Sequence, residues 1–266
     1  KVLIEPGVPD DTCEYCRTGR YNICPGVDFM ATQPNYKGAL TQYMTHPEEW
    51  TYHIPEGMTT MEGALVEPAA VGMHAAVLGG AQPGKSIVIL GGGTIGLMVL
   101  QACISLGATD ITVVDVIEKR LELAKKLGAA RVINGKEEDT VAVLRSEEMY
   151  GDHGVDLVFE AAGAVFTAQQ AVQIVSRGGK IMMVGTQSKP GPIDFLKINR
   201  EVTIQTSFRY CNNFPQTIEA ISSGRFNVKD MVTNIYDYED VQKAFEEAID
   251  PVKKTEMVKG VIKVAE

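Results

Sequence analysis

The sequence lacks a surplus of basic residues and lacks any long apolar run. Its 25 lysines and arginines stand against 34 aspartates and glutamates, which gives a formal net charge of −9. Nucleic acids and anionic membrane surfaces attract basic surfaces, so we expect neither as a partner. No apolar stretch approaches the roughly 18 residues of a membrane-spanning helix. These two absences argue against nucleic-acid-binding and membrane proteins and leave a small molecule as the expected ligand.

Cysteine is also scarce, with five in 266 residues, and three of the five lie between positions 13 and 24. An odd number of cysteines with three clustered fits a reducing compartment and a metal site better than a disulfide framework. We therefore expect the protein in the cytoplasm.

The clustered cysteines form the pattern Asp10-x-x-Cys13-x-x-Cys16, followed by Cys24. Two thiols at C-x-x-C spacing and a third further along can converge on a tetrahedral zinc ion. The fourth ligand would be an oxygen, and Asp10 stands at the regular three-residue offset. A site with four protein ligands has no position open for substrate, so the zinc would be structural. Metal-free cysteines, or a redox pair at Cys13 and Cys16, are the alternatives.

The most informative segment is residues 86–115, SIVILGGGTIGLMVLQACISLGATDITVVD. Gly91 would make a tight turn after an apolar strand, Gly93 would admit a pyrophosphate, and Gly96 would let a helix pack closely. The start of that helix offers free N–H groups to phosphates. Asp115, at the end of the next strand, can accept from ribose hydroxyls and repel the extra phosphate of NADP. The pattern predicts an NAD site, with an ordinary tight strand–helix turn as the alternative.

Strand-like and helix-like segments alternate from residue 86 to about residue 214, which predicts βαβ units and a doubly wound parallel sheet of the Rossmann type. The expected strands are 87–90, 111–115, 131–133, 155–159, 180–184 and 202–206, and the expected helices include 118–127 and 165–176.

The flanking regions differ in texture from this central one. Residues 1–60 are rich in Pro, Gly, Cys and Tyr, and a helix is expected at 63–79. Helices at 215–223 and 238–248 precede a last strand, 258–264, which could return to the first region. We expect two domains, a dinucleotide-binding domain at 81–214 and a mostly-β domain formed by 1–80 with 215–266.

Two further places carry candidate chemistry. Glu67 lies in an apolar helical segment, where a carboxylate is costly unless it is paired, hydrogen-bonded or metal-bound; a helix-end carboxylate in solvent is the alternative. Arg209 and Tyr210 directly follow the last expected parallel strand, and such loops line the ligand crevice. An arginine and a tyrosine there suit a substrate with several hydroxyls, unless they are a surface arginine and a packed tyrosine.

Together these segments resemble the zinc-dependent medium-chain dehydrogenase family, most closely its polyol (sorbitol, xylitol, L-iditol) dehydrogenase branch. The resemblance covers essentially the whole chain. It rests on IEPGVP, CEYCRTGRYNIC, FMATQP, GALVEPAAVGMHA, GGGTIG, VVD, FEAAG and FRYCNN. It implies a GroES-like catalytic domain beside the Rossmann domain and a homo-oligomer, dimeric or tetrameric. It also implies hydride transfer from a secondary alcohol of a polyol to NAD⁺, giving a ketose, with catalytic zinc lowering the pKa of the hydroxyl.

The resemblance also implies roles for individual residues. Glu67 matches the glutamate that binds the catalytic zinc or holds its water. Arg209 and Tyr210 match positions that contact polyol hydroxyls, and Phe29 and Thr32 match a segment that lines the cleft. Besides the glycine turn, the positions that match NAD contacts are Ile95, Asp115, Arg120, Val184, Gly185, Thr186, Ser207, Phe208 and Arg209.

Two departures from the family pattern set further expectations. Asp10 stands where the family has a cysteine, so its part in zinc binding is open. The cysteine and Gly-His-Glu ligands of the catalytic zinc precede the point that matches Lys1, so we expect this chain to bind NAD but to turn over weakly or not at all. Threonine- or glucose-type dehydrogenases, a zinc-free quinone-reductase-type relative and a non-catalytic NAD-binding module remain the alternatives.

Overall fold

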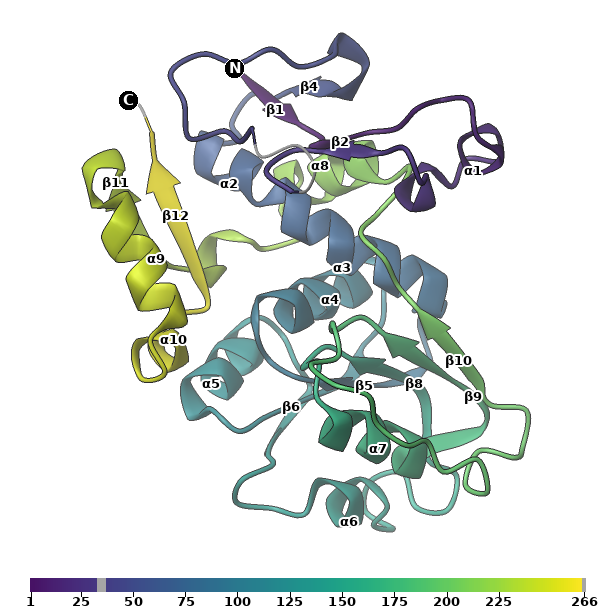
Figure 1. Ribbon diagram of the computed structural model, residues 1–266. Coiled ribbons are helices and arrows are strands. Elements are labelled where there is room, and N and C mark those ends of the chain that lie inside the picture. The colour runs from purple at the N-terminus through teal and green to yellow at the C-terminus, as the bar shows by residue number, and fades with distance from the viewer. Residues whose placement is uncertain (33–36, 265–266) are drawn as a thin grey trace.

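The computed structural model describes residues 1–32 and 37–264, and a six-stranded parallel sheet forms the centre of one half of it (Figure 1). The strand order is β10-β9-β8-β5-β6-β7, so the order reverses between β5 and β8. This is the arrangement in which ligands bind beyond the carboxyl ends of the strands at the reversal. The strands are β5 (Ser86–Leu90), β6 (Asp110–Asp115), β7 (Arg131–Asn134), β8 (Val155–Glu160), β9 (Val175–Met183) and β10 (Thr203–Thr206).

Helices cover both faces of this sheet because its strands are apolar on both sides. In β5, Ile87 and Ile89 belong to one buried core, whereas Val88 and Leu90 belong to a second core on the other face. Figure 1 shows helices on either side of the strands. The expected doubly wound α/β fold is confirmed. Its helices are α4 (Thr94–Ser105), α5 (Glu118–Lys126), α6 (Thr140–Leu144) and α7 (Val165–Ile174).

The helix expected at 63–79 is two helices, α2 (Thr60–Ala64) and α3 (Val66–Gly79). Thr59 and Glu62 form a reciprocal capping box at the start of α2. Pro68 lies in the first turn of α3, where its missing N–H is not needed. Gly80 ends α3 with φ 76°, in the left-handed region that favours glycine. Helix α3 runs between the two halves of the molecule (Figure 1).

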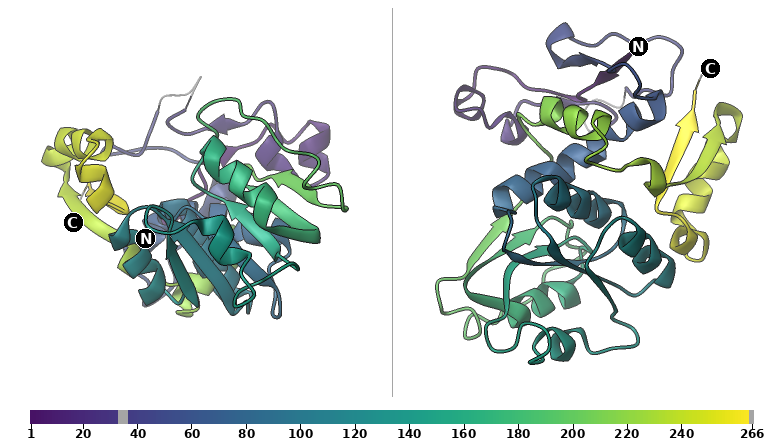
Figure 2. Two further views of the ribbon diagram at one scale, coloured as in Figure 1. Left: turned by 90° about the horizontal axis from the view of Figure 1, so that it is seen from below. Right: turned by 180° about the vertical axis from the view of Figure 1, so that it is seen from behind.

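The N-terminal region beyond α3 consists of short elements (Figure 2). Strand β1 pairs antiparallel with β4, and β2 pairs antiparallel with β3. These elements are β1 (Val2–Ile4), β2 (Gly7–Val8), α1 (Glu14–Arg17), the 3₁₀ turn η1 (Tyr21–Ile23), β3 (Asp28–Phe29), η2 (Glu48–Trp50) and β4 (Thr51–His53). Within FMATQP, Gln33 and Pro34 lie outside the described residues.

The last strand, β12 (Lys259–Lys263), does not return to the first region among the described residues. It pairs in parallel with β11 (Val232–Asp237), a strand that was not expected. The expected return to the first region was wrong, because β11, which lies nearer in the sequence, pairs with β12 instead. The other elements are α8 (Phe214–Ser222), η3 (Lys229–Met231), η4 (Tyr238–Asp240), α9 (Val241–Ile249) and α10 (Lys253–Glu256). In the part of the chain described, no helix is long and apolar enough to cross a membrane.

One buried core extends from the sheet into the N-terminal region. It contains Ile89 of β5, Met98 of α4, Ala69 of α3, Leu3 of β1 and Phe214 of α8. The backbones of α3 and α4 approach so closely that a side chain at Gly72 would lie 2.5 Å from the Met98 carbonyl carbon. This packing joins α3 to α4, and the first turns of both helices carry candidate site residues.

Candidate nucleotide site, substrate face and metal cluster

The glycine turn lies between β5 and α4, at the point where the strand order reverses. A Cβ at Gly96 would lie 1.8 Å from the Gly91 carbonyl oxygen, and a Cβ at Gly91 would lie 2.7 Å from the Ala162 nitrogen. Gly93 is different, because a Cβ there would meet only a guanidinium nitrogen of Arg120, at 3.9 Å. Two of the three glycines therefore allow close backbone packing, and the third leaves open space at the helix start. A pyrophosphate fits this arrangement.

Asp115 lies at the carboxyl end of β6 and its side chain holds the neighbouring turns. Its Oδ2 accepts from the Gly92 N–H at 2.7 Å, and its Oδ1 accepts from the N–H groups of Val116 and Ile117 at 2.8 and 2.9 Å. Each carboxylate oxygen has two lone pairs, so Oδ2 retains capacity for a ribose hydroxyl. A guanidinium nitrogen of Arg120 lies 3.7 Å from this oxygen.

The remaining expected nucleotide contacts also lie at the carboxyl edge of the sheet or at the start of α4. Ile95 is in the first turn of α4, and the other five follow the ends of β9 and β10: Val184, Gly185, Thr186, Ser207 and Phe208.

Sequence reasoning missed Glu160, which organises this edge. Its fully buried Oε1 accepts from the N–H groups of Ala162 and Gly163 at 3.0 and 2.9 Å, and its Oε2 accepts from the Gln187 side-chain amide at 2.8 Å. The loops after β8 and β9 are thereby joined beside the glycine turn. The signal was an acid at a strand end within FEAAG, the same placement that identified Asp115.

Glu67 lies in the first turn of α3, half-buried at the edge of an apolar hollow of about 640 Å³. Burial raises the pKa of the Glu67 carboxyl, while the nearby Tyr210, Lys259 and Arg209 oppose the rise. The Tyr210 hydroxyl is buried and has no partner at hydrogen-bonding geometry in residues 1–32 and 37–264. It is nevertheless close enough to Glu67 for burial and this carboxylate to raise the pKa of Tyr210 strongly. Glu67 can therefore accept a proton or a hydroxyl hydrogen bond.

Arg209 and Phe29, two residues far apart in the sequence, are in contact. The guanidinium carbon of Arg209 lies 3.8 Å from the centre of the Phe29 ring and 4.9 Å from that of Phe208. One guanidinium nitrogen of Arg209 is buried without a hydrogen-bond partner in the described part of the chain. Thr32 donates its hydroxyl to the Phe29 carbonyl at 2.8 Å and so closes the turn that carries Phe29. The structure thus gathers Arg209, Phe29 and Thr32 on one face.

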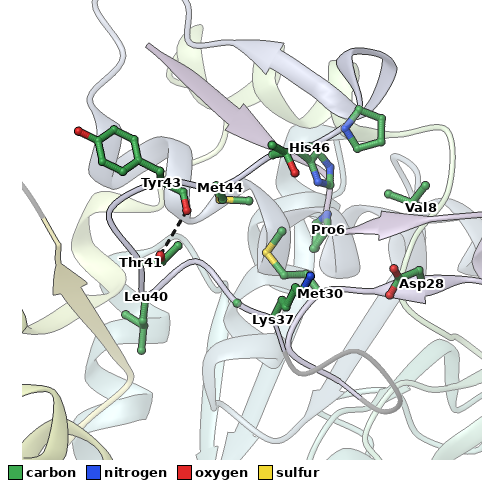
Figure 3. A pocket seen from close by; sticks show the side chains of 13 residues that line it. Pro6, Val8, Asp28, Met30, Lys37, Leu40, Thr41, Tyr43, Met44 and His46 are labelled. Carbon is green, nitrogen blue, oxygen red and sulfur yellow. Dashed lines mark hydrogen bonds between the residues drawn. The ribbon is translucent and has the colours of Figure 1, made fainter.

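A second hollow, of about 710 Å³, adjoins the one at Glu67 (Figure 3). The two share Pro6, Met30, Met44 and His46 in their walls. Both are lined by residues of the N-terminal region, among them His46, but among the described residues no group of three metal-ligating side chains with close ligand atoms includes Glu67.

The four residues of the cysteine pattern do converge. The ligand atoms of Asp10, Cys13, Cys16 and Cys24 all lie within 4.8 Å of one another, with 3.4 Å between the sulfurs of Cys13 and Cys16. Four ligands about 2.0–2.3 Å from a tetrahedral zinc lie roughly 3.3–3.8 Å apart, so these residues would hold that ion after closing by up to about 1 Å. Cys13 also caps α1, with its sulfur accepting from the Cys16 N–H at 3.4 Å.

Charge in this cluster is concentrated on Asp10. Its Oδ1 accepts from the N–H groups of Thr12 and Cys13 at 2.8 and 3.0 Å, and these bonds lower the pKa of Asp10 to about 2. The Cys16 N–H lowers the pKa of the Cys13 thiol. Desolvation and the neighbouring sulfurs raise the pKa of Cys16 to about 12. Without a cation, the negative charges of neighbouring ligands oppose one another. A bound cation would stabilise all the anionic ligands together.

A buried carboxylate that sequence reasoning missed contacts the segment between Cys16 and Cys24 through Tyr21. Glu5 is 1 % exposed, and its two oxygens accept from the hydroxyls of Tyr21 and Tyr52 at 2.7 and 3.0 Å. Burial raises the pKa of Glu5, partly offset by these two bonds. No spacing in the sequence relates Glu5 to its two tyrosine partners, because tertiary packing alone brings them together.

Comparisons with known proteins bear on the whole chain. The family model described as an alcohol dehydrogenase GroES-like domain matches residues 1–56, and the one described as a zinc-binding dehydrogenase matches residues 94–223. The zinc-type alcohol dehydrogenase-like protein YdjJ of Escherichia coli is 64% identical over 266 residues, which cover 100% of this chain and 76% of that protein. Sorbitol dehydrogenase of Bacillus subtilis is 41% identical over 252 residues, 94% of this chain and 70% of that enzyme.

A solved structure agrees with this result. The crystal structure of an Escherichia coli oxidoreductase/dehydrogenase of unknown specificity superposes with a TM-score of 0.96 at 63% identity, covering 100% of this chain and 75% of that one. The match extends through both halves of the molecule. The comparisons give no support to the expected weak turnover, which stays a prediction.

Proposed function

The chain belongs to the zinc-dependent medium-chain dehydrogenase family, close to sorbitol dehydrogenase, and on that premise we propose that it is an NAD-dependent dehydrogenase of polyols. Family membership makes it an oxidoreductase that acts on a small alcohol. The substrate class and the choice of NAD over NADP are the proposal.

The observation that carries the proposal is the placement of Arg209. Its guanidinium stacks on Phe29, close to the charge of Glu67, and the loop that carries it leaves the carboxyl end of β10. Guanidinium, phenol and carboxylate together supply five N–H donors, one hydroxyl and two acceptor oxygens. A chain of neighbouring hydroxyl groups uses donors and acceptors in this mixture, whereas a simple apolar alcohol leaves most of them unpaired. Unpaired buried polar groups are costly, which favours a polyol.

The proposed preference for NAD rests on Asp115. A carboxylate at the end of β6 accepts from both ribose hydroxyls of NAD and repels a 2′-phosphate. Arg120, 3.7 Å from that carboxylate, could receive a phosphate, but it already donates to the Lys254 carbonyl at 3.2 Å. We propose that Asp115 dominates. The proposed contacts beyond the glycine turn are Ile95, Asp115, Arg120, Val184, Gly185, Thr186, Ser207, Phe208 and Arg209.

In the proposed reaction, Arg209 and Tyr210 orient the polyol by its hydroxyls, and Phe29 and Thr32 fix the position of Arg209 and the wall beside it. Glu67 accepts the hydrogen of the reacting hydroxyl or of a water that relays it, and its raised pKa brings its basicity closer to that required near neutral pH. NAD⁺, when bound, accepts the hydride of the carbinol carbon. Gly93 and the N-terminus of α4 hold the pyrophosphate and so fix where the nicotinamide can reach.

Further parts of the proposal concern the cluster and the assembly. Asp10, Cys13, Cys16 and Cys24 would hold a structural zinc. The nucleotide domain would span 81–214, with 1–80 and 215–266 forming the GroES-like catalytic domain. The protein would be a homo-oligomer, dimeric or tetrameric, in the cytoplasm.

The test is reduction of NAD⁺ or NADP⁺, followed by absorbance at 340 nm, with sorbitol, xylitol, L-iditol, threonine, glucose and a simple secondary alcohol as substrates. We expect the polyols with NAD⁺ to give the highest kcat/KM. A preference for threonine or glucose would replace the polyol proposal with those alternatives. NAD⁺ binding that no polyol tightens, with no turnover of any alcohol, would favour the non-catalytic module.

A further inference from the structure

We propose that the segment between Cys16 and Cys24 positions the loop that carries Arg209, so that metal in the cysteine cluster controls the substrate face. The proposal rests on the proposed function for the role of Arg209 alone. The contact between the two segments follows from the geometry. In Figure 1 the chain between β10 and α8 passes beside α1 on its way to the N-terminal region.

The backbone of the loop at 208–212 is strained, so contacts with other segments must hold its conformation. Arg209 has φ 49° and Asn212 has φ 56°, so two residues with side chains adopt the left-handed region. That region is unfavourable for residues other than glycine, and it persists when surrounding contacts specify it. The orientation of the Arg209 side chain therefore depends on whatever holds the backbone on each side of it.

Three hydrogen bonds join this loop to residues 19–22, and two of them involve the loop backbone. The Asn22 side-chain amide donates to the Phe208 carbonyl at 2.8 Å, and the Asn212 N–H donates to the Tyr21 hydroxyl at 2.8 Å. The Asn212 side-chain amide donates to the Gly19 carbonyl at 2.6 Å. Two of the bonds flank Arg209 in sequence, so together they fix both sides of the residue.

The three residues that form these hydrogen bonds with the loop lie inside one short segment, and both ends of that segment are residues of the cysteine cluster. Gly19, Tyr21 and Asn22 fall between Cys16 and Cys24. A metal ion bound by both cysteines closes this segment into a loop and lowers its conformational freedom. Tyr21 also donates to the buried Glu5, so its ring is fixed from the interior as well. Metal occupancy is thereby coupled to the backbone on either side of Arg209.

The far end of the loop is anchored independently of the metal. The Asn213 side-chain amide donates to the Ala70 carbonyl of α3 at 2.9 Å in a buried position. The coupling should therefore affect residues 208–212 and leave α8 and the sheet unchanged. Asn22 and Asn212 act through Arg209 and are positioning residues.

Hydrogen exchange of the peptide 207–213, followed by mass spectrometry with zinc bound and after chelation, tests the coupling without turnover. The Asn212 N–H, which donates to the Tyr21 hydroxyl, should exchange at least about tenfold faster without zinc, because it is the backbone amide of this peptide that a contact with residues 19–22 protects. Exchange in residues 87–90 of β5 should not change. Equal exchange of 207–213 with and without zinc would overturn the proposal.

Two substitutions remove two of the three bonds without touching the cluster. Asn22→Ala deletes the donor to Phe208, and Asn212→Gly deletes the donor to Gly19 while a glycine still tolerates φ 56°. In the double variant the Asn212 N–H to Tyr21 bond remains without its two neighbours, so we expect zinc to slow exchange of 207–213 less than in the unaltered protein. One zinc should still bind per chain, and polyol binding should be at least about tenfold weaker. Asn199→Ala, an exposed asparagine in another loop, is the matched control.

The readouts separate the two hypotheses. If the polyol does not bind the unaltered protein but zinc still slows exchange of 207–213, the proposed substrate is wrong and the coupling stands. If the double variant still responds to zinc as the unaltered protein does, the coupling through Asn22 and Asn212 is wrong.

Discussion

The guanidinium carbon of Arg209 lies 3.8 Å from the centre of the Phe29 ring, which makes one surface from two residues 180 positions apart in the sequence. A desolvated cation over an aromatic face is stabilised by roughly 0.5–2 kcal/mol. The planar guanidinium also offers donors at its edge while its face is stacked. This pair is where the proposed substrate face meets the N-terminal region.

Replacing Arg209 with lysine should weaken polyol binding by at least about tenfold, because an ammonium cannot both stack and donate at its edge. Phe29→Leu should weaken it by about two- to thirtyfold, which is the value of the stacking interaction. The double variant should lose less than the product of the two, since both changes remove one contact. Calorimetric titration of sorbitol at saturating NAD⁺ measures each value. Phe195→Leu, at a phenylalanine that is 70 % exposed, is the control, and fully additive losses would show that the two side chains act separately.

Gly96→Ala should lower the stability of the fold, whereas Gly93→Ala should leave stability nearly unchanged and lower the affinity for NADH. A methyl group at Gly96 would lie 1.8 Å from the Gly91 carbonyl oxygen, so we expect a loss of about 3 kcal/mol or more in the free energy of unfolding. A methyl group at Gly93 meets only a flexible guanidinium at 3.9 Å, so stability should change little. It occupies the proposed pyrophosphate position, so NADH binding should fall by at least about tenfold.

Thermal unfolding and NADH fluorescence separate these two effects. Normal NADH binding by a folded Gly93→Ala variant would show that the nucleotide does not bind at the glycine turn.

Zinc in the cysteine cluster should depend on the charge of Asp10. Asp10→Asn keeps an oxygen for the N–H groups of Thr12 and Cys13 but removes the negative charge, so zinc affinity should fall by at least about tenfold. Asp10→Cys supplies a fourth thiolate and should retain zinc. Competition with a chromogenic chelator measures affinity, and elemental analysis should give one zinc per chain in the unaltered protein. Asp11→Asn is the matched neighbour, and equal affinity in both asparagine variants would exclude Asp10 as a ligand.

The contribution of the buried Glu5 to the free energy of unfolding should fall as pH rises. Its pKa is raised in the folded protein, so the folded state binds the proton more tightly than the unfolded chain does. The stabilisation is fully present below the unfolded pKa of about 4.5 and is lost as pH rises through the folded pKa. In Glu5→Gln this dependence is absent, so the stability of the variant relative to the unaltered protein should increase from pH 4.5 towards neutrality. Denaturant titrations at a series of pH values measure the difference in the free energy of unfolding between the two proteins. A difference that does not change with pH would contradict the prediction.

Periodicity predicted the nucleotide half well because its elements are set by local pattern. The apolar runs that became β5, β6 and β8 are buried on both faces, and the glycines between β5 and α4 meet steric demands within six residues of one another. Asp115 was recognisable because strand ends on one edge of a parallel sheet must meet the same ligand.

Other features depend on contacts that no local pattern records. Strand β11 alternates exposed and partly buried residues and has a register shift near Asn234, so it carries no continuous apolar signal. The network of Glu5, Tyr21 and Asn212 joins three distant segments. The cysteine cluster lies between these extremes, since the spacing named all four members, Asp10 included, and the fold brings their ligand atoms together.

The central claim is that one NAD binds at the glycine turn beside a face that recognises polyols. Its most direct test is calorimetric titration of NADH and NADPH, and of NAD⁺ with and without saturating sorbitol, which requires no turnover. The account predicts one NADH per chain, bound at least about tenfold more tightly than NADPH because of Asp115. It also predicts that sorbitol tightens NAD⁺ binding in the unaltered protein but not in Arg209→Gln. Equal affinity for NADH and NADPH, together with NAD⁺ binding that sorbitol leaves unchanged, would contradict it.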